Sequence, residues 1–435
     1  MKIAFVTLGC KVNQYETAVL EGLFGENGFE ITEDADTADV CVVNSCTVTA
    51  SADQKSRQAL RRLRRRNPGA VLVLTGCYPQ ASPDRAAALP EADIVTGTRD
   101  RRNLLPLVQN FLKTRERTVD VRPHDRSETF EPMRADRIPG HTRAFVKIED
   151  GCEQYCSYCA IPFARGPVRS KPPEEIRSEL ARLAAAGHRE IVLSGVNLPC
   201  YGRDLGLRLI DAVEAACSVP GIDRIRLGSL EPERLTEEDA ARMAAQPRVC
   251  DQFHLSLQSG CDETLRRMNR RYTAAEYAAQ AALLRRYFPN AALTTDVMTG
   301  FPGETEEEFA ASLAFVRSVG FAKVHVFPYS RRPGTRADRF PGQLTREVKE
   351  ERAARMSAAA EESRRTFLLG QLGRCEQVLF EDRAGGLWHG YTTNYTPVFL
   401  SSEEPLHNAL RTVRLTALYE DGCTGELSDS PPEKG

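Results

Sequence analysis

Three cysteines within eight residues limit what this 435-residue chain can fold into. They lie in the run Gly151-Cys152-Glu-Gln-Tyr-Cys156-Ser-Tyr-Cys159-Ala, with the spacing C-x3-C-x2-C. Three thiolates on one loop can hold three irons of a cubane iron–sulfur cluster, whereas electron-transfer clusters use four cysteines and structural zinc uses four ligands. The fourth iron would then be free to bind a substrate or cofactor. We therefore expect a fold that presents this loop beside a ligand-binding cavity.

A structural zinc site is the main alternative interpretation of these cysteines. It would need a fourth ligand close by, and the nearest histidines, His141 and His188, are not at zinc-finger spacing. Three thiols without a function, on one short loop, would be an oxidation liability. The spacing therefore favours an open-site iron–sulfur cluster.

The composition places the chain among ordinary globular proteins of several domains. Hydrophobic residues make up 41%, and no apolar stretch approaches the eighteen residues of a membrane span. No signal peptide precedes the first strand, so we expect a soluble cytoplasmic protein. Thirteen cysteines in such a chain point to metal binding or catalysis rather than to disulfides.

The first 118 residues alternate short apolar strands with helical segments, which predicts a parallel sheet covered on both faces. Residues 119–141 are rich in Pro, Arg, Asp and Glu and are interpreted as an interdomain linker. The expected strands are Lys2–Leu8, Val40–Asn44, Val71–Thr75 and Ile94–Thr96, and the expected helices are Gln14–Asn27 and Ala52–Arg66.

Residues 142–342 form a second α/β series, and six strand–helix units suit a partial (β/α)6 barrel. The active site of such a barrel gathers at the carboxyl ends of its strands. The cysteine loop directly follows the first of these strands, which agrees with that rule. The expected strands are Arg143–Ile148, Glu190–Ser194, Arg224–Gly228, Gln252–Leu257, Ala292–Met298 and Lys323–Phe327.

The last part of the chain changes character. Residues 343–370 contain one long connecting helix, Thr345–Leu369, and residues 371–424 carry short strands typical of a small β-barrel. Residues 425–435 are expected to be a disordered acidic tail. Residues 371–435 hold ten Asp or Glu against five Lys or Arg, a net charge of −5.

A second group of three cysteines follows three strands of the first domain. Cys10, Cys46 and Cys77 each come just after a strand end, in Leu-Gly-Cys, Asn-Ser-Cys and Thr-Gly-Cys. The carboxyl ends of parallel strands lie along one edge of a sheet, where ligands bind in open α/β folds. A buried cysteine can also be a small apolar side chain, as we expect of Cys41. Three at equivalent strand ends instead favour a second three-cysteine cluster.

These motifs resemble those of the methylthiotransferase family of radical S-adenosylmethionine (SAM) enzymes over nearly the whole chain. The similar segments include Thr7–Thr17, Asn44–Thr49, Cys152–Cys159, Ser256–Gly260 and Gly300–Phe309. The last part is similar to an RNA-associated TRAM barrel. The run Gly-Cys-Lys-Val-Asn-Gln-Tyr-Glu-Thr and the segment His325–Ser330 resemble the branch that modifies N6-threonylcarbamoyladenosine in tRNA.

The resemblance implies the chemistry and the cofactors. A methylthio group would be added at carbon 2 of N6-threonylcarbamoyladenosine, at tRNA position 37 next to the anticodon. One SAM at the cluster of Cys152, Cys156 and Cys159 would yield a 5′-deoxyadenosyl radical, and a second SAM would donate the methyl group. The Cys10, Cys46 and Cys77 cluster would hold or supply sulfur. The implied partners are tRNA, an electron donor of flavodoxin or ferredoxin type and a sulfur donor, and we expect a monomer.

Further residues are assigned to SAM or RNA by their positions. Thr305 and Glu308 predict a capping box for the helix after Gly300. The expected SAM contacts are Arg165, Gly195, Asn197, Glu231, Gln258 and Gly300. The expected RNA contacts are Arg61, Arg62, Arg64 and Arg65, although such a basic run is also typical of a solvated helix face.

Two other functions stay open at the level of sequence. One is methylthiolation of a ribosomal protein, a further branch of the same family. The other is a non-catalytic iron–sulfur protein that binds RNA or senses redox state. The second is less favoured, because a sensor has no need of an iron left open for SAM.

Overall fold

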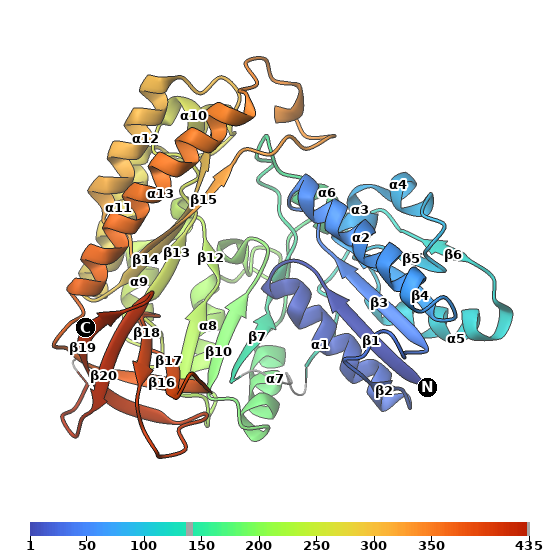
Figure 1. The fold of residues 1–435 in the computed structure, drawn as a ribbon, viewed down its shortest axis with the longest axis horizontal. Coiled ribbons are helices and arrows are strands. Elements are labelled where there is room, and N and C mark those ends of the chain that lie inside the picture. Colours follow the sequence, from blue (N-terminus) through green and yellow to red (C-terminus); the bar gives the residue numbers. More distant parts are fainter. Residues whose placement is uncertain (136–141, 433–435) are drawn as a thin grey trace.

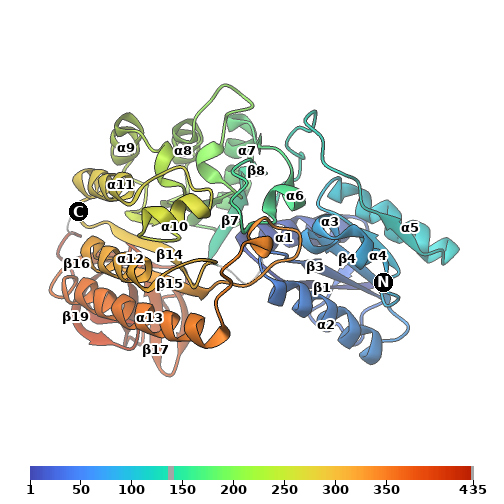
Figure 2. The ribbon, with the colours of Figure 1, turned by 90° about the horizontal axis from the view of Figure 1, so that it is seen from above.

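The protein is described here by a computed structural model that covers residues 1–135 and 142–432. Figure 1 shows an N-terminal α/β domain, a central domain whose curved sheet is covered by helices, and a small C-terminal barrel below the central domain. Seen from above, the N-terminal domain lies beside the β7 edge of the central sheet (Figure 2). The predicted fold class is therefore confirmed.

The N-terminal domain is built on a six-stranded sheet with all neighbouring strands parallel. Every residue of the two central strands β3 and β4 is buried, as their continuous apolar sequences predict. In spatial order the strands are β2 (Glu30–Ile31), β1 (Lys2–Thr7), β3 (Val40–Ser45), β4 (Val71–Gly76), β5 (Ile94–Thr96) and β6 (Thr118–Asp120).

Helices cover both faces of this sheet. Helix α2 (Ala50–Arg66) packs Leu60 and Leu63 on one face. Helix α1 (Lys11–Glu26) lies on the other face, between this sheet and the central domain, and its Tyr15 and Val19 belong to a core shared with β7. The two domains therefore share one continuous hydrophobic core. The remaining helices here are α3 (Cys77–Ala81), α4 (Pro83–Ala87) and α5 (Leu104–Thr114).

The central domain has two parallel sheets that join at Gly228. The chain passes directly from β11 to β12 there, so the strands form one curved sheet that is open between β15 and β7. This is the predicted partial barrel. Its strands are β7 (Arg143–Lys147), β10 (Glu190–Ser194), β11 (Arg224–Leu227), β12 (Ser229–Leu230), β13 (Gln252–Leu255), β14 (Ala292–Thr299) and β15 (Lys323–Pro328).

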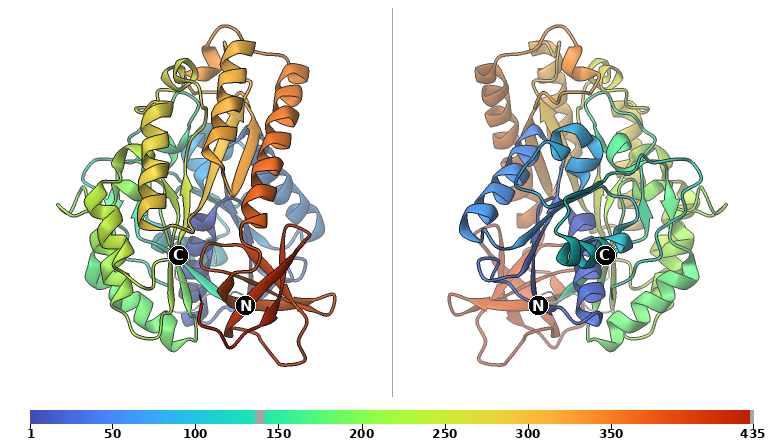
Figure 3. Two further views of the ribbon diagram at one scale, coloured as in Figure 1. Left: turned by 90° about the vertical axis from the view of Figure 1, so that its left-hand side faces the viewer. Right: turned by 90° about the vertical axis from the view of Figure 1, so that its right-hand side faces the viewer.

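Helices pack on the outer face of the curved sheet (Figure 3). The predicted capping box is present, since Thr305 accepts from the Glu308 N–H and Glu308 accepts from the Thr305 N–H. None of the described helices is both long and apolar enough to span a bilayer. The helices are α6 (Ile161–Arg165), α7 (Pro173–Ala185), α8 (Leu209–Cys217), α9 (Glu237–Ala244), α10 (Asp262–Arg267), α11 (Ala274–Tyr287), α12 (Glu306–Val319) and α13 (Arg346–Leu369).

The C-terminal part is a closed five-stranded barrel around Val378, Phe380 and Val413. The prediction of a disordered tail from residue 425 is wrong at its start, because Gly425 to Leu427 are paired with β19. The strands are β16 (Cys375–Ala384), β17 (Leu387–Tyr391), β18 (Pro397–Leu400), β19 (Leu410–Tyr419) and β20 (Gly422–Leu427).

The segment predicted as a linker, 119–141, is not a free connector where the structure describes it. It begins inside β6, and Phe130, Met133 and Ala135 are buried. The Tyr15 hydroxyl donates to the Met133 carbonyl at 2.9 Å. The segment is therefore packed against both domains, because its few apolar residues are spaced to reach the shared core. Residues 136–141 of the predicted linker lie outside the described residues.

Candidate functional site

The first cysteine loop is closed by a short antiparallel pair, β8 (Glu149–Asp150) and β9 (Arg169–Ser170). The Cys152 N–H donates to the Gly166 carbonyl at 3.0 Å. Gly151 has a φ of +98°, and a Cβ there would lie 1.9 Å from the Pro167 carbonyl oxygen. Only glycine fits this close approach, so the residue before Cys152 fixes the start of the loop.

Each thiol of this loop has a donor beside it. The Asn197 amide lies 3.7 Å from the Cys152 Sγ, the Ile161 N–H lies 3.4 Å from the Cys159 Sγ, and Arg270 Nη1 lies 3.4 Å from the Cys156 Sγ. Burial, together with the neighbouring Cys156 thiol, raises the pKa of Cys159 to about 12. Thiols in such a setting ionise when a metal binds and displaces the proton. The donors then stabilise the charge on sulfur.

The donor set can hold a cubane cluster, in which each cysteine binds a different iron. Two buried oxygens beside Cys152, Asn197 Oδ1 and Glu149 Oε1, have no hydrogen-bond partner among the described residues. They suit a polar ligand at the open iron, such as the amino group of SAM.

The predicted SAM contacts are placed as follows. Gly195 leaves room for Glu149, since a Cβ there would lie 2.5 Å from Glu149 Oε2. Glu231 pairs with Arg270, the donor to Cys156, and therefore lies near the first triad. Gln258 has a φ of +65° and pairs with β14 through its backbone.

Gly300 has a structural task of its own. Its N–H donates to Glu304 at 2.8 Å, and a Cβ there would lie 2.4 Å from the Lys349 side chain on α13. This packing explains the glycine without a cofactor.

The second triad sits at the ends of three neighbouring strands, as predicted. Cys10, Cys46 and Cys77 follow β1, β3 and β4, and Gly9 has a φ of +123° that brings its Cα close to the Cys46 side chain. Burial raises the pKa of Cys77 to about 12, and both other thiols of the triad act on it. Three thiols therefore meet at one sheet edge, while Cys41 is buried inside β3 as expected.

Arg165, predicted as a SAM contact, lies against the second triad, since its Nε donates to the Cys77 Sγ at 3.2 Å. Its guanidinium also lies 3.4 Å from Asp150, two residues before Cys152. It also forms an ion pair with Glu16 at 2.5 Å. The reason is tertiary: α6 ends at Arg165 and packs against α3, which begins at Cys77.

A buried ionic network of basic and acidic groups surrounds this contact. Burial raises the pKa of Glu16, but Arg101 and Arg165 outweigh it and lower that pKa to about 2. The cations around Glu16 and Asp150 are Arg101, Lys147, Arg165 and Arg169. Glu131 and Glu128 pair with Arg101 and Arg169 in the same network, so its cations are matched by carboxylates. Glu16 lies six residues after Cys10, within the motif Thr7–Thr17. Its place in that motif was a sequence signal that could have identified it as a site residue.

Arg332 connects the two triads and was missed by sequence reasoning. Its guanidinium contacts Thr47, the residue after Cys46, and lies 3.2 Å from Asp53. It is also among the charges that oppose the burial-driven rise in the pKa of Cys159. The side chain is buried, and its Nε and Nη1 have no hydrogen-bond partner among the described residues. Nothing in its turn-rich sequence, Ser-Arg-Arg-Pro-Gly, marks it as part of a site.

The four arginines predicted to bind RNA have different environments on α2. Arg64 donates to the Pro68, Ala70 and Glu91 carbonyls and pairs with Asp93 at 2.6 Å, so it holds the domain together. Arg61 pairs with Glu91 at 3.1 Å. Arg62 and Arg65 are exposed. Only these last two are presented to solvent without a bonded partner within the described chain.

Comparisons with known proteins cover nearly the whole chain. Residues 146–316 match the model of the radical SAM superfamily, and residues 2–97 match the model described as Uncharacterized protein family UPF0004. The threonylcarbamoyladenosine tRNA methylthiotransferase MtaB of Bacillus subtilis is 37% identical, over 95% of this chain and 93% of that protein. The tRNA-2-methylthio-N(6)-dimethylallyladenosine synthase of Pelotomaculum thermopropionicum is 32% identical, over 100% and 99%.

Solved structures support the fold. The radical SAM methyltransferase TsrM of Kitasatospora setae superposes with a TM-score of 0.57, at 17% identity, over 77% of this chain and 74% of that chain. Membership of the radical SAM superfamily implies one [4Fe-4S] cluster and SAM, which the first triad and its donors fit. By its two domains, its C-terminal barrel and its near full-length similarity to these enzymes, the chain belongs to the methylthiotransferase family of radical SAM proteins.

Proposed function

We propose that this protein is a tRNA methylthiotransferase that adds a methylthio group at carbon 2 of N6-threonylcarbamoyladenosine, at position 37 beside the anticodon. Four relatives that carry the threonylcarbamoyladenosine name are 34–37% identical to it. One observation carries the proposal: the two cysteine triads are joined across the domain interface, by Arg165 at Cys77 and by Arg332 at Thr47. A substrate between them can meet both a hydrogen-abstracting site and a sulfur site.

The chain's residues divide the work as follows. Cys152, Cys156 and Cys159 hold a cluster that, with SAM bound, supplies the radical needed to attack an unactivated C–H bond. Asn197 and Glu231 orient SAM beside that loop, helped by Gly195 and Gln258. The second triad holds a further cluster, and Arg165 compensates the charge of its thiolates through the contact with Cys77.

Recognition of tRNA falls to exposed cations and the C-terminal barrel. Arg62 and Arg65 offer free charge on α2, and phosphate binding is electrostatic. The reaction also needs an electron donor, of flavodoxin or ferredoxin type, and a sulfur donor. We expect the protein to act as a monomer.

The test is mass spectrometry of tRNA nucleosides from a host that lacks the gene, with and without the gene restored. We expect 2-methylthio-N6-threonylcarbamoyladenosine only on restoration. Cys156→Ala and Cys46→Ala should fail to restore it, whereas Cys217→Ala, a buried cysteine of α8, should succeed. Unchanged tRNA would contradict the proposal, and a methylthiolated ribosomal protein would then point to the other branch.

A further inference from the structure

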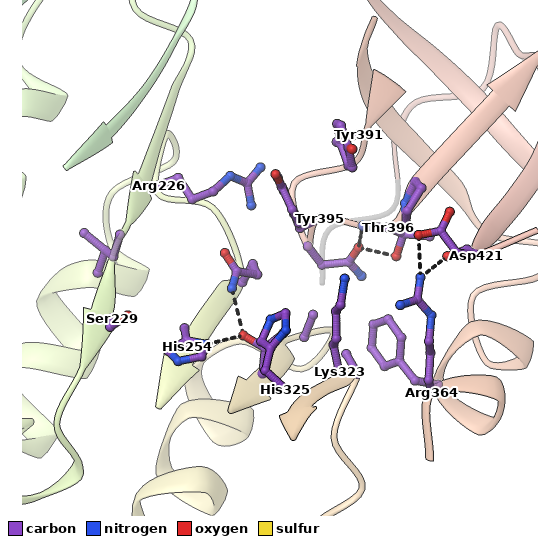
Figure 4. A pocket seen from close by; sticks show the side chains of 18 of the residues that line it. Arg226, Ser229, His254, Lys323, His325, Arg364, Tyr391, Tyr395, Thr396 and Asp421 are labelled. Atoms are coloured by element: carbon purple, nitrogen blue, oxygen red, sulfur yellow. Dashed lines mark hydrogen bonds and ion pairs between the residues drawn. The ribbon is translucent and has the colours of Figure 1, made fainter. Parts of the chain in front are cut away.

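A cavity of about 360 Å³ lies between the inner face of the curved sheet and the C-terminal barrel. Figure 4 shows Arg226, His254, Lys323 and His325 on the sheet side, with Tyr395 on the opposite side. Lys11 of α1 also lines it. The cavity is therefore built by all three domains, and neither cysteine triad belongs to it.

The charge of this cavity is only partly neutralised. Arg364 pairs with Asp421 at 3.0 Å, and Arg226 pairs with Glu190 at 2.9 Å. Lys11 lies over the Phe145 ring at 5.7 Å. In the parts of the chain that the structure describes, neither the Lys11 nor the Lys323 ammonium has an ion pair or a hydrogen bond. Two cations that line one cavity without a partner among the described residues attract an anion electrostatically.

The cavity lies in line with the first cysteine loop. Lys323, His325 and Phe327 alternate along β15 and share its inner face, opposite Thr294, Asp296 and Met298 of β14. At the carboxyl end of β14, Met298 packs against a hydrophobic cluster around Phe301, and Tyr158 of the cysteine loop packs against the same cluster. Lys323 precedes Phe327, the partner of Met298, by four residues, which is about 13 Å along β15. A base bound at the carboxyl ends of the strands, beside the cysteine loop, can therefore extend a substituent along the sheet toward Lys323. The flexible side chain of Lys323 shortens the distance between its ammonium and that substituent.

The names of the relatives indicate which anion could bind in this cavity. The threonylcarbamoyl group carries a carboxylate, whereas the dimethylallyl group named for other relatives is uncharged and apolar. Both sets of relatives are similar to the chain at 32–37% identity, so overall similarity separates them poorly. A cavity with two unpaired lysines favours binding of the negatively charged threonylcarbamoyl group over the uncharged dimethylallyl group.

We propose that Lys11 and Lys323 bind the carboxylate of the threonylcarbamoyl group and thereby select this substrate over one with an uncharged N6 substituent. The inference rests on the proposed function and adds the residues that determine its specificity. The competing anion is a phosphate of the RNA backbone, which carries the same charge at every nucleotide.

The test uses the reconstituted holoenzyme under anaerobic conditions and three anticodon stem-loop RNAs of one sequence. They carry N6-threonylcarbamoyladenosine, its carboxyl methyl ester, or unmodified adenosine. We expect the wild type to bind the acid on the order of ten-fold more tightly than the ester, because a charge-assisted hydrogen bond is lost in the ester. Lys323→Met and Lys11→Met should abolish that ratio, and Lys323→Arg should largely keep it. Lys113→Met, an exposed lysine of α5, is the matched control.

The outcomes separate the possibilities. Equal binding of acid and ester by the wild type overturns the inference, whether or not the enzyme converts the acid to its methylthio product. Equal weakening of all three RNAs by Lys323→Met, with a smaller salt dependence, also overturns it and assigns the cavity to a backbone phosphate. The proposed function is judged separately, by whether the wild type forms the methylthio product on the acid at all.

Discussion

Arg165 in the central domain donates a hydrogen bond from Nε to the Sγ of Cys77 in the N-terminal domain, at 3.2 Å. The same guanidinium pairs with Glu16. One side chain thus ties the second thiol site to the domain that carries the first.

Replacing Arg165 should damage both the second site and the domain interface. In Arg165→Met, Glu16 and Asp150 lose a buried cation, which we expect to cost about 3 kcal/mol of unfolding free energy. The iron bound per chain after reconstitution should also fall. Urea unfolding and iron analysis measure the two effects. Arg177→Met is the control, because Arg177 pairs with Glu174 on the surface. Normal iron and normal stability in Arg165→Met would contradict the assignment.

The two triads should be separable by their products. A Cys46→Ala/Cys77→Ala protein should keep about half of the wild-type iron and still cleave SAM under reduction, because the first cluster is intact. It should form no methylthio product. A Cys152→Ala/Cys156→Ala protein should lose SAM cleavage as well. Iron analysis, liquid chromatography of cleaved SAM and nucleoside mass spectrometry are the readouts, and full iron in the first protein would exclude a second cluster.

Arg332 should be needed for turnover more than for cluster binding. Its Nε and Nη1 are buried and have no hydrogen-bond partner among the described residues, and preorganised donors of this kind can stabilise developing negative charge. Arg332→Gln should lower product formation by roughly 100-fold with little change in iron content. Arg331→Gln is the neighbouring control, since Arg331 is exposed and pairs with Asp338. A parallel loss of iron in Arg332→Gln would make its role structural.

The arginines of α2 should fall into two classes. Arg62→Gln/Arg65→Gln should weaken tRNA binding and lower the salt slope by up to about 2, one for each lost phosphate contact. Arg64→Gln should instead lower the thermal midpoint, because its carbonyl contacts and its pair with Asp93 are lost. Affinity measured over a salt series, together with thermal unfolding of each variant, distinguishes the classes. Unchanged affinity in the double variant would remove α2 from the RNA-binding surface.

Acid should weaken the buried pairing of Glu190 with Arg226 and Arg224. Burial raises the pKa of Glu190, but the two arginines outweigh it and hold that pKa below its usual value. The stabilisation is then present above the ordinary glutamate pKa of about 4.3 and is lost as the pH falls through the lower folded value. Glu190→Gln should cost about 3 kcal/mol at pH 7. The difference from wild type should shrink below about pH 4 in urea unfolding, whereas Glu361→Gln on the exposed face of α13 should show no such pattern.

Much of the fold could be predicted because its signals are local. The continuous apolar runs of β3 and β4, the alternation of strands and helices, and the capping box at Thr305 each depend on neighbours within a few residues. Strand β20 was missed because Gly422–Leu427 has little apolar periodicity and is recruited by pairing with β19. The packed segment before residue 136 was missed because its burial depends on helix α1 and on α7.

The sequence by itself determined both groups of thiols. The first is a local spacing, and the second follows from the rule that parallel strands end at one edge. Only the tertiary structure decided the partners of the charged side chains: Arg165 contacts Cys77, Arg64 contacts backbone carbonyls, and Arg332 contacts Thr47. The physical reason is that a long charged side chain takes its partner from whatever the packed domains bring within reach, across 88 residues for Arg165 and 285 for Arg332, and no local pattern encodes that distance.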